Sequence, residues 1–126
     1  MEHAPGFLRL VEESRKRIRE TTPEAVHARQ RAGERFHLVD VREDSEWDQG
    51  RAAGAVHLGK GVIERDVERV FPDLDADIVL YCGGGYRSAL AAVAHLLQRV
   101  RRVQSMSGGW RRWRELALPV TGVQDG

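Results

Sequence analysis

The order of elements along the chain predicts an α/β fold, and three observations carry that prediction. Two short apolar runs rich in β-branched residues, 36–41 and 77–81, have the length and composition of buried strands. Stretches with helix-start signals or helical spacing alternate with such runs. Strands joined through helices form parallel sheets covered on both faces. We therefore expect a central parallel sheet of four to five strands with helices on both faces, preceded by an N-terminal helix.

The length of 126 residues fits one domain of ordinary size. We divide it into an N-terminal helical extension at 1–20, a domain at 21–122 and a short C-terminal tail at 123–126. The single cysteine, Cys82, gives no basis for a disulfide framework or a Cys-rich zinc site, so we expect no metal and no cofactor. No apolar run approaches the roughly 20 residues of a membrane span, and the N-terminus has no secretory pattern. These features predict a cytoplasmic protein that binds no membrane.

Charge divides the chain near its cysteine. Residues 82–126 hold 7 arginines and 2 acids, a balance of +5, whereas residues 1–81 hold 13 basic and 17 acidic residues, a balance of −4. A positive second half can draw anions toward the site, but the sequence favours a solvated arginine-rich face. The arginines form two short groups and the pI is only 8.0, which argues against a nucleic acid partner.

The first elements are two helices and a short strand. Apolar residues recur near helical spacing and predict an amphipathic helix over 6–17. The tripeptide Thr22-Pro23-Glu24 starts a second helix, because threonine caps, proline suits the first position and glutamate suits the positive end. That helix runs to about residue 31 and stops at Gly33. Between the two helices, residues 18–20 supply a short fifth strand.

The remaining elements alternate between strand and helix. Apolar β-branched runs predict the strands, and stretches rich in alanine and leucine predict the helices. In chain order we expect a strand at 36–41, a weaker strand at 55–58, a helix at 62–71, a strand at 77–81, a helix at 87–100, a strand at 103–106 and a closing helix at 110–118.

The predicted chemistry is centred on Cys82, which leaves the carboxyl end of the strand at 77–81. Open α/β sheets bind their ligands at that end. Three glycines follow, and they let the backbone curl so that successive N–H groups form an anion-binding nest. The helix that starts near Arg87 adds its positive end, and Arg87 adds a fixed charge, so the thiolate is favoured over the thiol. The alternative is that Cys82 is a small buried residue followed by a plain turn.

Four segments in the same order resemble the rhodanese homology domain, from about Thr22 to Val120. The most specific is 82–88, Cys-Gly-Gly-Gly-Tyr-Arg-Ser, which is similar to the family pattern C-x-x-G-x-R-S. Residues 38–43 resemble the first-strand signature D-V-R-E, and residues 50–55 resemble the turn G-H-I-x-G-A. Residues 107–120 resemble the family ending with G-G-W-x-x-W.

The resemblance implies a single rhodanese-like domain at 21–122 with sulfurtransferase activity. In this family the cysteine takes a sulfane sulfur from a donor, thiosulfate or a persulfide, and passes it to a thiophilic acceptor, cyanide or a thiol. The resemblance makes Cys82 the nucleophile and persulfide carrier, with small-molecule or protein donors and acceptors as partners. It also assigns a substrate-binding loop to Gly83, Gly84, Gly85, Tyr86, Arg87 and Ser88.

Two other functions stay open. One is a related phosphatase or arsenate reductase, and phosphatases built on this fold have one more residue between cysteine and arginine. Here four residues separate Cys82 from Arg87, so the loop suits a sulfane sulfur better than a phosphate. The other possibility is a rhodanese-like sulfur-relay or regulatory interaction module. Such modules typically lose the cysteine, which this chain keeps.

Charged and aromatic residues outside the loop receive simpler interpretations. Asp40 and Arg42 lie at the end of the strand at 36–41, where they either form an ion pair that orients the loop or a plain structural salt bridge, and the second is favoured. Trp110 and Trp113 are three residues apart, which predicts core or cleft-wall packing. None of the five histidines shares a motif with Cys82, so no Cys–His pair is expected.

Overall fold

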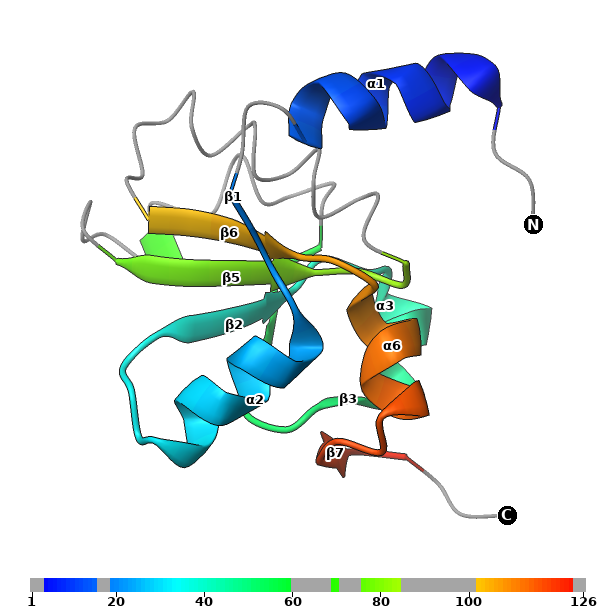
Figure 1. Ribbon diagram of the computed structural model, residues 1–126. Helices are drawn as coiled ribbons and strands as arrows, with labels where there is room; N and C mark the ends of the chain where they lie inside the picture. Colours follow the sequence, from blue (N-terminus) through cyan, green and yellow to red (C-terminus); the bar gives the residue numbers. More distant parts are fainter. Residues whose placement is uncertain (1–3, 16–18, 60–68, 71–75, 85–101, 124–126) are drawn as a thin grey trace.

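A parallel sheet forms the centre of the computed structural model, which describes residues 4–15, 19–59, 69–70, 76–84 and 102–123. The sheet has five strands in the order β1-β6-β5-β2-β4, and every neighbouring pair is parallel (Figure 1). The predicted parallel sheet is therefore confirmed, including its short first strand. The strands are β1 Arg19–Thr21, β2 His37–Asp40, β4 Val56–His57, β5 Asp77–Tyr81 and β6 Arg102–Met106.

β5 is the central strand of the sheet, and residues 78–81 form a continuous apolar run. It lies between β2, which pairs Leu38 with Val79, and β6, which pairs Val103 with Ile78. Residues 78–81 have no exposed surface. A strand covered on both faces needs apolar side chains on both, which produces a continuous apolar run. The carboxyl ends of the parallel strands meet at one edge of the sheet, and Cys82 lies at that edge.

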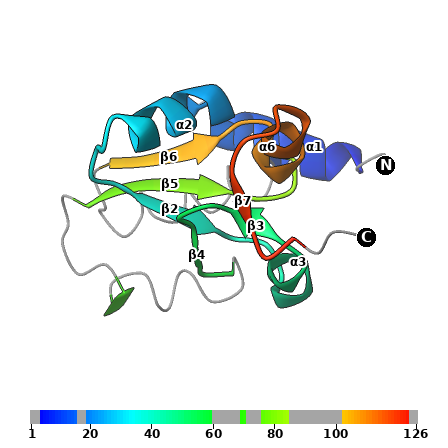
Figure 2. The same cartoon turned by 90° about the horizontal axis from the view of Figure 1, so that it is seen from below.

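Helices lie on both sides of the sheet. α2 (Pro23–Arg31) and α6 (Gly109–Glu115) lie on one side, below the sheet in Figure 1, and α1 (Pro5–Arg15) lies beyond the other side. The view in Figure 2 again places α2 and α6 over the same face. α2 begins as predicted, because the hydroxyl of Thr22 accepts a hydrogen bond from the backbone N–H of Ala25 at 3.1 Å.

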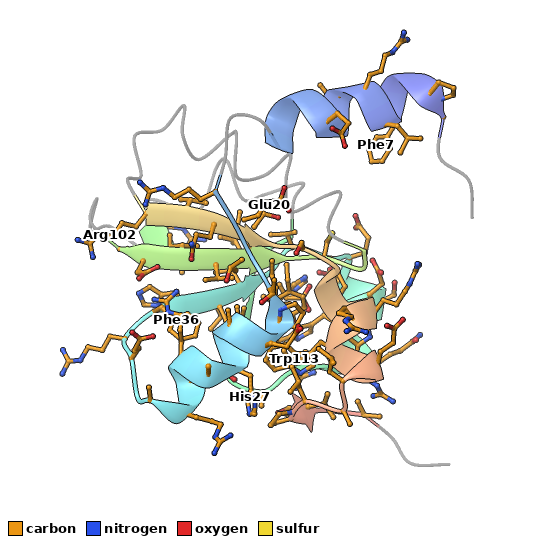
Figure 3. The ribbon with its side chains drawn as sticks, in the orientation of Figure 1. Phe7, Glu20, His27, Phe36, Arg102 and Trp113 are labelled. Atoms are coloured by element: carbon orange, nitrogen blue, oxygen red, sulfur yellow. The ribbon has the colours of Figure 1, made fainter. Side chains whose placement is uncertain are left out.

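Two apolar cores form, one on each face of the sheet, because successive strand residues point to opposite sides. Val79 and Tyr81 belong to the core that includes Trp113 of α6. In Figure 3 Trp113 lies between α2 and α6. Ile78 and Leu80 belong to the opposite core, which also contains Cys82. The side chain of Cys82 therefore lies on the face of the sheet away from α2 and α6.

Several elements differ from the sequence predictions. A short helix, α3 (Asp44–Asp48), and a two-stranded antiparallel sheet of β3 (Arg51–Ala52) and β7 (Val120–Thr121) were not predicted. The closing helix ends at Glu115, earlier than expected. The predicted helix at 87–100 lies outside the described residues, as does most of the helix at 62–71. No described helix has both the length and the apolar character that a membrane crossing requires.

Candidate active site

Cys82 is the first residue after β5, at the edge of the sheet where the predicted site lies. Its side chain is 1% exposed and packs in the apolar core with Val39, Val41 and Leu80. The position after the strand agrees with the prediction, and the burial is deeper than a loop cysteine would have. This burial also fits the alternative of a small buried residue, so the backbone around Cys82 has to distinguish the two interpretations.

The backbone of the loop is held by α6. The carbonyl oxygen of Cys82 accepts a hydrogen bond from the N–H of Trp110 at 2.7 Å, and that of Gly83 accepts one from the N–H of Arg111 at 3.0 Å. These donors belong to the first turn of α6, whose N–H groups have no partner within the helix. Gly83 and Gly84 are half-buried. The other predicted loop residues, Gly85, Tyr86, Arg87 and Ser88, lie outside the described residues.

Close approach of α6 to the loop requires glycine at position 109. Gly109 has φ of +54°, a left-handed conformation that favours glycine. A Cβ atom there would overlap the carbonyl oxygen of Cys82 and come within 3.0 Å of the carbonyl oxygen of Gly83. Glycine at position 109 therefore has a physical reason, which is contact between α6 and the loop that begins at Cys82.

Asp40 and Arg42 form the predicted ion pair at the end of β2. The guanidinium Nη2 of Arg42 lies 2.8 Å from Oδ2 of Asp40, and Nε lies 3.0 Å from the same oxygen. Arg42 also donates to the carbonyl of Gly50 at 2.6 Å, and both charged side chains are buried. The guanidinium lies 4.8 Å from the ring centre of Trp110. The pair thus contacts the residue whose N–H holds the Cys82 carbonyl.

Tyr81 is a buried polar residue that the sequence analysis did not single out. Its hydroxyl accepts a hydrogen bond from the N–H of Ala52 at 3.1 Å and interacts with the Asp40 carboxylate. Burial, and then the negative charge of Asp40, raise the pKa of Tyr81 well above its usual range. A buried tyrosine needs a partner for its hydroxyl, so a tyrosine at the end of an apolar strand is itself a signal of such a network.

His57 lies at the same edge of the sheet, at the end of β4. Its Nε2 donates to the carbonyl of Arg42 at 2.8 Å, and its ring stacks on Trp47 with centres 4.9 Å apart. Since β2 lies between β4 and β5, about two inter-strand spacings separate His57 from Cys82 in the sheet. His57 therefore contacts the Asp40–Arg42 pair through its hydrogen bond to the backbone carbonyl of Arg42. Among the described residues, no group of three or more His, Cys, Asp or Glu side chains is placed to hold a metal ion.

The sequence model of the rhodanese-like domain matches residues 22–116. The chain belongs to the rhodanese-like domain family. This confirms the resemblance that the motifs indicated. The match includes Cys82 and the first turn of α6, so the contact between them lies within the rhodanese-like domain.

Two proteins similar to this rhodanese-like chain are named sulfurtransferases. A putative sulfurtransferase, YtwF, of Bacillus subtilis is 31% identical over 96 residues, which is 76% of this chain and 90% of the relative. A sulfurtransferase of Allochromatium vinosum is 30% identical over 107 residues, 85% of this chain and 98% of the relative. Both relatives are matched over nearly their whole length.

A solved structure from Rhodopseudomonas palustris superimposes with a TM-score of 0.85 at 25% identity. It covers 96% of this chain and 98% of that protein. That protein is described as one of unknown function and a possible tyrosine phosphatase. The names of the two relatives therefore support sulfur transfer as the general activity of this rhodanese-like chain. The phosphatase description belongs to the Rhodopseudomonas protein.

Proposed function

We propose that this protein is a sulfurtransferase that carries a sulfane sulfur as a persulfide on Cys82. The observation that carries the proposal is the position of Cys82 directly after the central strand, with the carbonyl groups of Cys82 and Gly83 bound by the first turn of α6. Membership of the rhodanese-like family and relatives named sulfurtransferases support the same reaction class. The proposed donors are thiosulfate or a persulfide, and the proposed acceptors are cyanide or a thiol.

The reaction proceeds in two balanced steps. The thiolate of Cys82 attacks the outer sulfur of thiosulfate, a new S–S bond forms, the S–S bond of thiosulfate breaks, and sulfite leaves with the electron pair. Cyanide then attacks the terminal sulfur of the persulfide, thiocyanate forms, and the thiolate of Cys82 returns. Backbone N–H groups next to the sulfur would stabilise the anion that is present before and after each step. The chain supplies the nucleophile and these donors, so no cofactor is proposed.

Phosphate-ester hydrolysis is the second candidate, because the Rhodopseudomonas neighbour is described as a possible tyrosine phosphatase. Four residues separate Cys82 from Arg87, one fewer than in phosphatases related to this fold, which argues for the smaller sulfur atom. A sulfur-relay role, in which another protein supplies or receives the sulfur, uses the same persulfide and differs only in the partner.

Intact-protein mass spectrometry tests the proposal. Thiosulfate is expected to add the mass of one sulfur atom, and cyanide is expected to remove it. Cys82→Ser should abolish both changes, because the chain has no other cysteine. Sulfur uptake by Cys82→Ser would contradict the assignment to Cys82. Hydrolysis of aryl phosphates by the wild type faster than sulfur transfer would favour the phosphatase instead.

A further inference from the structure

The contact between α6 and the loop fixes the direction of two peptide groups. In a trans peptide the C=O and the N–H point in opposite directions. The carbonyls of Cys82 and Gly83 both point to the first turn of α6, at Trp110 and Arg111. The N–H groups in the same two peptide units belong to Gly83 and Gly84, so both point away from α6.

The direction away from α6 is also the direction of the Cys82 side chain. α6 lies on the face of the sheet whose core contains Tyr81 and Trp113. The Cys82 side chain belongs to the core on the opposite face, with Val39 and Leu80. The N–H groups of Gly83 and Gly84 and the thiol of Cys82 therefore lie on the same side of the backbone. The hydrogen bonds that orient these N–H groups come from α6, on the opposite side.

We propose that the first turn of α6, residues 109–111, is a positioning clamp that aims the N–H groups of Gly83 and Gly84 toward the sulfur of Cys82. The clamp itself touches no substrate, and it acts by holding two carbonyl groups. Its use in sulfur transfer rests on the proposed function, because the same donors would stabilise both the thiolate and the persulfide anion. The aim of the N–H groups does not depend on that function.

The clamp is anchored at its far side by the buried ion pair. The ring of Trp110 lies against the guanidinium of Arg42, whose carboxylate partner Asp40 is fixed at the end of β2. Arg114, on the next turn of α6, also has its guanidinium near this ring, at 5.5 Å from the centre. The first turn of α6 thus contacts both the end of β2 and the residues that follow β5, which limits how far the loop can turn.

Replacing Arg111 with two different residues isolates one hydrogen bond of the clamp. The side chain of Arg111 is exposed, and its N–H donates to the carbonyl of Gly83. Arg111→Ala removes the charge and keeps the N–H, whereas Arg111→Pro removes both, and proline is tolerated in the first turn of a helix. The difference between the two variants therefore reports the loss of this N–H together with the ring that replaces it, which crowds the Gly83 carbonyl and restricts Trp110. Asp40 and Arg42, the charged residues at the end of the neighbouring strand, are the same in both.

The readout is the pH profile of alkylation of the single cysteine by iodoacetamide. The plateau of the profile reports access to the sulfur, and the midpoint reports ionisation of the thiol. We expect the midpoint of Arg111→Pro to lie above that of Arg111→Ala, because one of the aimed donors is released. Equal midpoints in two folded variants, as judged by circular dichroism, would overturn the clamp.

Gly109→Ala provides a second comparison, with Gly33→Ala as its control. Both glycines have positive φ, but a Cβ at Gly33 meets nothing within 4 Å, whereas one at Gly109 overlaps the Cys82 carbonyl. Both variants carry the backbone strain, and only Gly109→Ala should raise the midpoint. A midpoint raised equally in both would assign the effect to general loss of stability and overturn the clamp.

NMR spectra of the wild-type backbone amides test the direction of the N–H groups without any variant that has to fold. When the thiol ionises, the amide protons of Gly83 and Gly84 should move downfield, and they should not do so in Cys82→Ser. If these protons fail to respond in the wild type, the N–H groups do not point to the sulfur. A wild type that shows this response but takes up no sulfur from thiosulfate would overturn the proposed function and leave the clamp in place.

Discussion

Asp40 shows how much of this site depends on one buried carboxylate. It has no exposed surface and accepts hydrogen bonds from the backbone and the guanidinium of Arg42, and it also interacts with the Tyr81 hydroxyl. Charges are buried in proteins only when they are paired and hydrogen-bonded, and both conditions are met here. The sequence favours a plain structural salt bridge, and the contact of Arg42 with Trp110 extends that pair toward the loop that begins at Cys82.

Removing the carboxylate should be costly at this position. Asp40→Ala leaves the 3% exposed guanidinium of Arg42 without its charged partner, which typically costs about 3–5 kcal/mol of unfolding free energy. Glu115→Ala is the control, because it breaks an exposed pair with Arg112 and should cost about 0.5 kcal/mol or less. Urea denaturation of both variants measures the difference. Similar losses in the two variants would show that the Asp40–Arg42 pair contributes no more than a surface pair.

Tyr81 connects three strands at the level of secondary structure. It ends β5, its hydroxyl interacts with Asp40 at the end of β2, and it accepts the N–H of Ala52 in β3. β3 pairs with β7, which brings the end of the described chain into the same network. One side chain therefore links the central strand to the small antiparallel sheet of β3 and β7.

The raised pKa of Tyr81 gives the folded protein a pH-dependent stability. The folded state keeps the phenol proton at pH values where the unfolded chain, with a pKa near 10.0, has lost it. The unfolded state then binds fewer protons, so stability falls as pH rises above about 10, by up to roughly 1.4 kcal/mol per pH unit. This contribution is fully present below pH 10.

Tyr81→Phe should remove that slope. The variant loses about 1–3 kcal/mol at neutral pH because the N–H of Ala52 and the Asp40 carboxylate each lose a partner. Above pH 10, its stability should fall less steeply than that of the wild type. Urea unfolding at several alkaline pH values compares the two slopes. Parallel curves would mean that Tyr81 ionises in the folded state as easily as in the unfolded chain.

Across the whole molecule, the sequence predicted the elements that have a strong local pattern. β5 and β2 were found because each contains a short buried apolar run, 78–81 in β5 and 38–39 in β2. The two-residue strands β3 and β7 were missed because two residues carry no periodicity, and their pairing joins segments nearly 70 residues apart. α3 was missed because it has five residues and Glu43 before it is not a typical capping residue.

The residues of the candidate site also fall into those that a local sequence motif predicts and those that only the fold brings together. Cys82, Asp40 and Arg42 could be selected because each belongs to a short motif. The contributions of Tyr81 and of the Trp110 N–H could not, because they depend on which strands and helices become neighbours in the fold. The glycine pair before Trp110 was visible in the sequence, but the reason for Gly109, close approach to the Cys82 carbonyl, requires the structure.

Charge at the scale of the whole molecule should affect the rate at which an anionic donor reaches Cys82. The balance of +5 in residues 82–126 includes Arg111, Arg112 and Arg114 of α6, and the first turn of this helix contacts the residues that follow β5. Thiosulfate is a dianion, so a positive field near the site increases its encounter rate, and salt screens that field over about 8–10 Å. Iodoacetamide is neutral and should not respond.

We therefore expect the second-order rate constant for sulfur loading from thiosulfate to fall about two- to fivefold between about 0.01 M and 0.15 M salt. Alkylation of Cys82 by iodoacetamide should change little over the same range. Arg112→Gln, which changes an exposed side chain paired with Glu115, should lower the thiosulfate rate at low salt and make its salt dependence less steep, while leaving alkylation unchanged. The two rates are measured by mass spectrometry on the same samples, which removes differences in protein concentration. An equal fall for both reagents would show that salt acts on the protein and not on the approach of the anion, and the arginine-rich half would then be a solvated surface.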